Sequence, residues 1–271
     1  MQSYVIRTAP NEIRPYLVLL GGAPHKLGVS IADYVASLEP AGDYQRHAPR
    51  IIESMHPETW LAEHPNHDQG NVAVVLAVGP VSEADKSVLE RLCAMIGDRC
   101  VVVIDEATEI NANWKSTIRL PPQSSRENCC MESVQVLLSI LLLPAADRGR
   151  IMDLTPDLLA LLKGHESRLT YAHSNGLDDI QEVVDKALQQ LVERADPATF
   201  DSLIVTAFRG PNVPLHEMRA AMASCGKSLP NAISVFFLPG HEDGGRFSIG
   251  LIAGIDGGHN SQPQLMKALN E

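Results

Sequence analysis

The stretch VVLAVGPVSEADKSVLERL, residues 74 to 92, decides the fold of the first half of the chain. The apolar run from Val74 to Val78 predicts a buried strand, and a helical pattern begins soon after Gly79. A buried strand that turns directly into a helix is half of a βαβ unit, and such turns often hold phosphate groups. The residues of this turn therefore have to be tested for that chemistry.

The same alternation extends to both sides of this stretch. Residues 16–20 predict a strand that ends in two glycines, and a helical spacing follows over 31–38. Residues 101–104 predict a second buried strand, and residues 116–120 a short further one. Continuous apolar strands that alternate with helices indicate a parallel sheet with both faces covered, which is an α/β layer. The apolar face of the helix after the opening turn consists of Ala84, Val88, Leu89, Leu92, Met95 and Ile96.

The second half of the chain has a different pattern. An apolar helix is predicted over 131–143, and Pro144 ends it. Thr155 is a candidate N-cap for an amphipathic helix over 156–163. Another helix runs from after Asp178 to about Arg194, and the last predicted elements are a strand over 202–208, a helix over 214–224 and strands over 232–238 and 247–255. The run HEDGGR, 241–246, predicts a turn that joins the last two strands into an antiparallel hairpin, so this part is predicted to be α+β.

The composition excludes several classes of protein. With a net charge of −11 and a pI near 5.3, the chain has no excess of basic residues to bind the phosphate backbone of a nucleic acid. The first residues carry no apolar leader, and the longest apolar run, 134–143, is about half of the ~20 residues that a membrane span needs. Five cysteines without a CxxC pair fit reduced thiols. We expect a cytoplasmic protein with no membrane span and no nucleic-acid partner.

Two further clusters suggest chemistry only weakly. A histidine-rich loop could supply metal ligands, but its spacing matches no known site, and a solvated loop is the simpler interpretation. A Cys/His hydrolase built on Cys129 or Cys130 would need a histidine nearby, and nothing in the sequence brings one there. We therefore predict no metal site. The histidine-rich cluster consists of His56, His64, His67 and Asp68.

The order of elements resembles the FtsZ/tubulin superfamily. ESVQVLLSILLLP, followed by RGRIMDLTPDLLALL, resembles the central helix, the catalytic loop and the next helix of that family. Three further segments resemble the activation domain of that family. Its opening helix is similar to HSNGLDDIQEVVDKALQQL, its first strand and helix to SLIVTAFRGPNVPLHEMRAAM, and its closing hairpin to HEDGGRFSIGLIAGID. The likeness is clearest over 131–256. It implies a Rossmann-like domain over 1–130, a central helix over 131–150 and an activation-like α+β domain over 151–271.

In this superfamily, the turn after the fourth strand is rich in glycine and threonine, and its backbone amides hold the GTP phosphates. Here the turn reads GPVSEAD and begins at Gly79. Pro80 lacks an N–H, and Glu83 and Asp85 place carboxylates at the positive end of the helix. Ser82, with an acid three positions later, is typical of a capping box. We predict a helix cap here rather than a working phosphate loop.

The other family positions are only partly matched. The first turn, GGAPHKLGVS, keeps Gly21 and Gly22, and Lys26 could meet an anion there, although a glycine pair also makes a simple strand-to-helix turn. The family's catalytic loop carries two acids that position water near the GTP of the neighbouring protomer. The second acid corresponds to Asp157, and Asp153 could supply the first only after a local shift. Alone, Asp157 is also typical of an acid in the first turn of a helix.

These observations lead to two functions of different classes, beside the alternative of an unrelated α/β protein. The first is an FtsZ/tubulin-like protein that has lost GTP hydrolysis, needs no cofactor, and acts through self-association or a protein partner. The second is a divergent GTP-binding protein or GTPase that polymerises in an FtsZ-like manner, with GTP and Mg²⁺ as its cofactors. Its candidate nucleotide-binding residues are Gly21, Gly22, Lys26, Gly79 and Ser82, and its candidate catalytic residues are Asp157 and Asp153.

Overall fold

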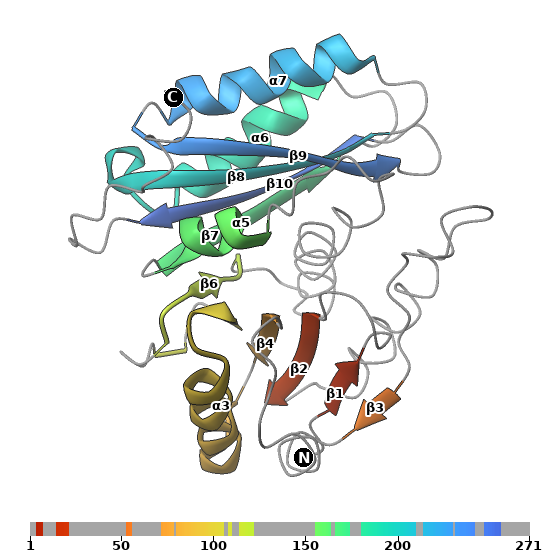
Figure 1. Ribbon diagram of the computed structural model, residues 1–271. Coiled ribbons are helices and arrows are strands. Elements are labelled where there is room, and N and C mark those ends of the chain that lie inside the picture. The colour runs from red at the N-terminus through yellow and green to blue at the C-terminus, as the bar shows by residue number, and fades with distance from the viewer. Residues whose placement is uncertain are drawn as a thin grey trace, which may run out of the picture. The chain divides into compact units, whose positions relative to one another are not determined.

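A computed structural model of the 271-residue chain divides into two compact units, Met1–Ile151 and Met152–Glu271. In the described residues of each unit, paired strands carry helices on one face: α3 (Glu83–Ile96) in the first unit, and α6 (Ile180–Val192) and α7 (Leu215–Ser228) in the second (Figure 1). The structure describes residues 4–7, 15–21, 53–55, 72–78, 80–105, 108–109, 114–121, 155–163, 166–173, 180–209, 214–229, 231–241 and 247–255.

The sheet of the first unit is mainly parallel. Its strands follow the order β3-β1-β2-β4-β5-β6; β2, β4, β5 and β6 run parallel, and β1 pairs antiparallel with β2 and β3. The predicted parallel α/β layer is confirmed, because the apolar runs form its central strands. The short strands β1 and β3 were not predicted. The strands are β1 (Tyr4–Arg7), β2 (Pro15–Gly21), β3 (Glu53–Met55), β4 (Val72–Val78), β5 (Cys100–Ile104) and β6 (Thr117–Arg119).

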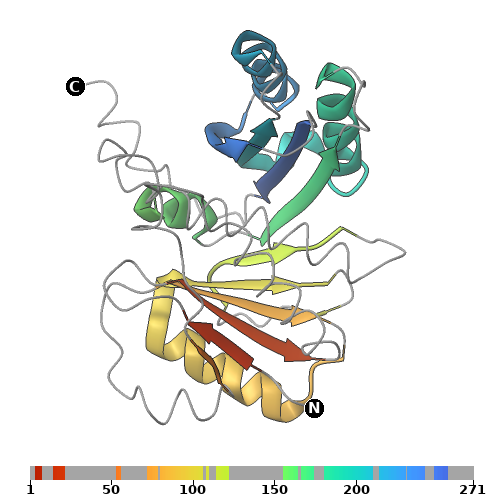
Figure 2. The same cartoon turned by 90° about the vertical axis from the view of Figure 1, so that its right-hand side faces the viewer.

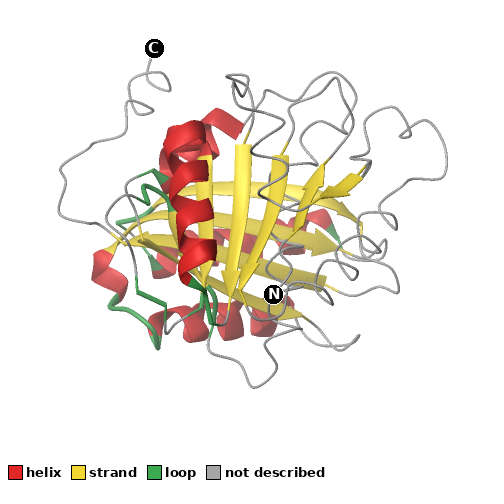
Figure 3. Cartoon of the chain, turned by 90° about the horizontal axis from the view of Figure 1, so that it is seen from below, coloured by secondary structure: helices red, strands yellow, loops and turns green. Residues whose placement is uncertain are grey.

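Helix α3 (Glu83–Ile96) covers one face of this sheet (Figures 2 and 3). Leu89 and Leu92 are fully buried, and burial of each leucine side chain contributes about 1.5–3 kcal/mol. The prediction was wrong at Ala84, which is exposed. The buried residue of this first turn is Asp85, because its side chain bonds back to Ser82 in the capping box. The opposite face of the sheet is also buried. The residues packed between α3 and the sheet include Val18, Leu20, Val75, Ala77, Val88, Leu89, Leu92, Ile96, Val102 and Ile104.

The sheet of the second unit has the strand order β7-β10-β8-β9. Strand β10 is antiparallel to both of its neighbours, whereas β8 and β9 are parallel. Helix α5 opens this unit at Thr155, and α6 and α7 cover one face of its sheet (Figure 1). The elements are α5 (Thr155–Leu162), β7 (Glu166–His173), α6 (Ile180–Val192), β8 (Phe200–Arg209), α7 (Leu215–Ser228), β9 (Ile233–His241) and β10 (Phe247–Ile255).

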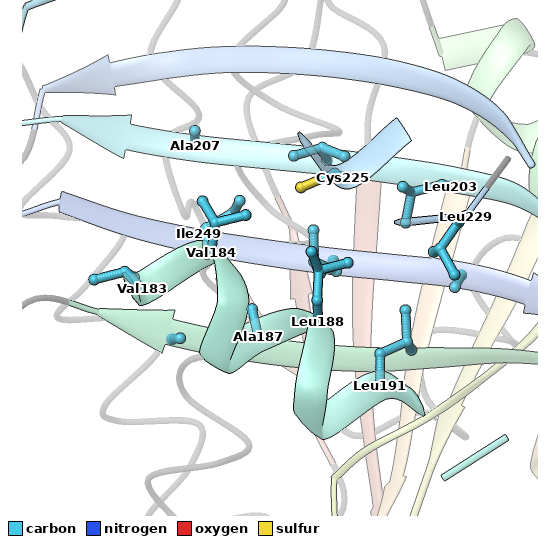
Figure 4. Packing of buried hydrophobic residues seen from close by; sticks show 14 of the residues in the cluster. Val183, Val184, Ala187, Leu188, Leu191, Leu203, Ala207, Cys225, Leu229 and Ile249 are labelled. Atoms are coloured by element: carbon cyan, nitrogen blue, oxygen red, sulfur yellow. The ribbon is translucent and has the colours of Figure 1, made fainter. Parts of the chain in front are cut away.

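The core of the second unit lies between its sheet and the helices α6 and α7. Figure 4 shows Val184 and Leu188 of α6 gathered with Ile249 of β10 and Leu203 of β8. These four side chains are almost fully buried, and Phe200 and Phe247 are also buried in the same cluster. One apolar stripe on α6, with the period of a helix, therefore holds this layer together.

The predicted hairpin of the last two strands is wrong. Strand β10 lies between β7 and β8, so β8 separates β10 from β9. The physical reason is burial, because β10 is buried from Phe247 to Gly254 and gains hydrogen-bonded neighbours on both sides in a central position. The turn chemistry of 241–246 does not decide which strands pair. Strand β7 was not predicted, because it contains several polar residues and its alternation of buried and partly exposed positions is irregular.

Some predicted elements lie outside the described residues. These are the helical spacing over 31–38 and the central helix over 131–150. Among the helices that the structure describes, none is long and apolar enough to cross a membrane.

Candidate functional site

The turn between β4 and α3 is closed by a capping box. The backbone N–H of Asp85 donates to Ser82 Oγ over 3.2 Å, and the N–H of Ser82 donates to Asp85 Oδ2 over 3.2 Å. Ser82 Oγ also donates to Asp85 Oδ2 over 2.7 Å. Ser82 has extended backbone angles, and its carbonyl accepts the first helical hydrogen bond, from Lys86 N–H. The capping box predicted from the sequence is therefore confirmed.

This cap determines the electrostatics of the turn. Asp85 is only 8% exposed, and its carboxylate is held in the first turn of α3 by the capping box. A carboxylate in that place neutralises the positive end of the helix dipole. A phosphate brought to the same turn would meet this negative charge, and the N–H groups of Ser82 and Asp85 already have acceptors. The described donor set thus fits a helix cap better than a phosphate cradle.

The exposed rim of the turn carries a second acid, Glu83. Its Oε1 lies 2.7 Å from Lys86 Nζ, and both side chains are largely exposed. The same contact raises the pKa of Lys86. A solvent-exposed pair of this kind contributes little to stability, because water and salt screen it. Lys86 is therefore engaged with an acid of its own helix.

The structure places the ends of β2 and β4 side by side. Gly21 is the last residue of β2 and pairs in register with Val78, the last residue of β4. These two carboxyl ends of parallel strands therefore lie at one edge of the sheet. In open α/β sheets this edge is where ligands bind. Of the candidate nucleotide-binding residues, Gly22, Lys26 and Gly79 lie outside the described residues.

The candidate catalytic acids belong to the second unit. Asp157 is the third residue of α5, in its first turn as predicted, and only its backbone is described. Asp153 lies outside the described residues, as does the histidine-rich segment with His56, His64 and His67. Within the described ranges, no group of three or more histidine, cysteine or acidic side chains could hold a metal ion.

The same edge of the first sheet carries a cation that sequence reasoning missed. Arg119, the last residue of β6, donates from Nη1 to the carbonyls of Asp105 and Thr108, over 3.2 and 2.9 Å. Thr108 Oγ1 donates to Asp105 Oδ1 over 2.6 Å and tightens the turn after β5. The guanidinium therefore anchors the β5 turn to β6. An arginine near the end of the predicted strand 116–120 is the only signal that could have pointed to it.

Comparison with known proteins supports the fold through structure rather than sequence. No protein-family model matches the chain, and the search of curated proteins finds no match. The structure is similar to an FtsZ from M. jannaschii described as an empty dimer, with a TM-score of 0.54 at 14% identity, over 73% of this chain and 66% of the FtsZ chain. This match spans just under two thirds of that FtsZ.

Two further solved structures are similar to this chain over a comparable length. A mutant FtsZ from M. jannaschii has a TM-score of 0.55 at 15% identity and covers 73% of this chain and 68% of its own. CetZ from Methanosaeta thermophila has a TM-score of 0.53 at 12% identity, over 79% and 68% of the two chains. At such low identity the likeness defines the fold alone. The protein is therefore a divergent chain with the FtsZ/tubulin-like fold.

Proposed function

We propose that this protein is an assembly or interaction module that keeps an FtsZ/tubulin-like body and does not hydrolyse GTP. The observation that carries the proposal is the capping box of Ser82 and Asp85. It lies in the turn that the resemblance to the FtsZ/tubulin superfamily matches to the phosphate loop. A fold can persist through selection for packing and contacts after its site has changed.

Nucleotide binding at this turn would require the cap to open. Loss of an N-cap costs about 0.5–2 kcal/mol, and the carboxylate of Asp85 would still repel the incoming phosphates. Pro80 adds to this cost, since it has no N–H to offer. The combined penalties favour a protein in which this turn stabilises α3.

The assembly part of the proposal rests on the fold. One solved structure with this fold is described as an FtsZ dimer. We extend to the present chain only the capacity to associate, either with a second copy or with a protein partner. Each unit has a buried apolar core in the described residues, so each can present a folded surface for such contacts.

Two measurements on the purified chain test the proposal together. Calorimetric titration with GTP and GDP in the presence of Mg²⁺, up to millimolar nucleotide, should show no saturable heat. Sedimentation velocity over a range of protein concentrations should show association that nucleotide does not change. Micromolar GTP binding would contradict the proposal and favour a divergent GTP-binding protein.

The variant Asp85→Asn sharpens the nucleotide measurement. It removes the charge at the helix end and keeps an oxygen that can accept from Ser82 N–H. If the carboxylate is what excludes phosphate, the variant should bind GTP more tightly than the parent chain. Equal absence of binding in both would leave the carboxylate of Glu83 and the missing N–H of Pro80 as the obstacles.

A further inference from the structure

Two cysteine thiols meet at the far end of α3. The Sγ atoms of Cys93 and Cys100 are 3.4 Å apart. Cys93 lies in the last turn of α3 and is half-buried, whereas Cys100 is the first residue of β5 and only 2% exposed. Both residues are free thiols in the structure. One accessible sulfur therefore contacts one protected sulfur.

The backbone between them is built to hold this contact. Gly97 has φ 66°, a conformation that other residues rarely adopt, and its N–H donates to the carbonyl of Cys93. A 3₁₀ turn over Gly97–Arg99 follows, and the N–H of Cys100 donates to the carbonyl of Gly97. These hydrogen bonds fold the chain back, so that a separation of seven residues brings the sulfurs together.

The two thiols differ in acidity in a way that suits them to different roles. The hydrogen bond between them lowers the pKa of Cys93, although burial and the charge of Glu90 oppose this. The same hydrogen bond, together with burial, raises the pKa of Cys100. The thiolate is the reactive form of cysteine, so these pKa directions and the greater exposure of Cys93 make Cys93 the better nucleophile of the two.

We propose that Cys93 and Cys100 form a peroxide-reactive modification site that closes to an intramolecular disulfide. The Cys93 thiolate attacks one peroxide oxygen, the O–O bond breaks, and the departing oxygen takes a proton and leaves as water or an alcohol. Cys93 is then a sulfenic acid. The Cys100 sulfur attacks the Cys93 sulfur, and the S–O bond breaks as water leaves with the Cys100 proton. The two thiols lose two electrons, and the peroxide gains them.

Closure needs only a small movement. The sulfurs must approach from 3.4 Å to about 2.05 Å, and both ends of the bond lie next to the turn at Gly97. The product ties the last turn of α3 to the start of β5. This inference does not depend on the proposed function, because it concerns the opposite end of the helix from the capped turn.

Peptide mapping of the full chain tests the inference directly. Hydrogen peroxide is added to the native protein, the remaining thiols are alkylated after unfolding in denaturant, and trypsin then cuts after Arg91, Arg99 and Lys115. Cys93 and Cys100 fall on separate tryptic peptides, 92–99 and 100–115, so their disulfide appears as a linked pair that a dithiol reductant separates. We expect this pair to become the main product. Linkage is a better readout than mass alone, since Met95 on the same peptide can also be oxidised.

The buried thiol of Cys225 is an internal reference that needs no mutation. Burial raises its pKa to about 12, so its peptide should remain alkylatable while the linked pair forms. We expect the pair to form at least about tenfold faster than Cys225 is lost. Equal rates, a link from Cys93 to a cysteine other than Cys100, or no link at all would overturn the proposal.

Two variants separate the roles of the sulfurs. In Cys100→Ala, the sulfenic acid at Cys93 has lost its partner and should accumulate, where dimedone traps it. In Cys93→Ala, Cys100 loses the hydrogen bond to Cys93 but keeps its burial, which raises the pKa of a thiol, so it should stay a thiol under the same peroxide treatment. Rapid oxidation of Cys100 in that variant would show that Cys93 is not the required nucleophile, and it would overturn the order of steps.

Discussion

The amino end and the carboxyl end of α3 are held in different ways. At the amino end, Ser82 and Asp85 satisfy each other's backbone groups across three residues. At the carboxyl end, the turn at Gly97 places Cys93 against Cys100, a residue of the sheet. The first device is local and satisfies the N–H groups at the helix end, whereas the second depends on packing and leaves the thiol of Cys93 half-buried. One helix thus carries a capped end and an end with a pair of thiols in contact.

A cavity among the buried apolar residues of α3, which lie between its two ends, should have the largest effect on the free energy of unfolding. Leu92→Ala removes a fully buried side chain from the contact of α3 with the sheet, and we expect a loss of about 2–5 kcal/mol in the free energy of unfolding. Urea unfolding followed by circular dichroism measures it. Ser87→Ala, at an exposed position of the same helix, is the matched control and should change stability by less than about 0.5 kcal/mol. Similar values for both variants would show that the packing of α3 does not limit stability.

Gly97→Ala tests the backbone of the carboxyl end alone. A methyl group at this position would meet no atom within 4 Å, so the effect isolates the cost of the positive φ. We expect a loss of about 1–3 kcal/mol in the free energy of unfolding. Formation of the Cys93–Cys100 link under peroxide should slow as well. If stability and linkage are both unchanged, the turn relaxes at little cost, and Gly97 is not what positions the thiols.

Ser82→Ala tests the amino end in the same assay. The substitution removes the acceptor of Asp85 N–H, and we expect a loss of about 0.5–2 kcal/mol. Ser82→Gly is the control, because glycine at an N-cap typically costs only a few tenths of a kcal/mol. If Ser82→Ala were neutral, the capping box would not stabilise α3, and its role in the proposed function would weaken.

Lys86→Gln should have the smallest effect. The substitution breaks the exposed contact with Glu83 and leaves the capping box in place. We expect no resolvable change in unfolding free energy, at low or at high salt, because solvent screens the pair. A clear, salt-dependent destabilisation would mean that the rim of the turn contributes to the amino end beyond the cap.

Much of the first unit could be predicted from the sequence. Strands β4 and β5 consist of continuous apolar residues that any position other than a covered sheet would expose to water. The capping box could be predicted as well, since Ser82 and Asp85 are three residues apart and bond within one turn. In both cases the decisive contacts lie close together in the chain.

The thiol pair and the anchor at Arg119 could not be predicted in this way. The spacing of Cys93 and Cys100 matches no recognised thiol motif. They meet because Gly97 turns the chain and β5 packs against α3. Arg119 bonds to carbonyls 11 and 14 residues earlier, across the pairing of β5 with β6. The sequence contains the functional groups of both features but does not show which group each one will face.

The sequence by itself determined the α/β class of the first unit, the capped amino end of α3 and the helix after Asp178, because periodicity and short-range hydrogen bonding act within one element. Only the tertiary structure decided that β10 enters between β7 and β8 and that Cys93 reaches Cys100. Strand order and side-chain contact depend on the burial of whole strands against distant partners. Local turn residues such as HEDGGR cannot outweigh that burial.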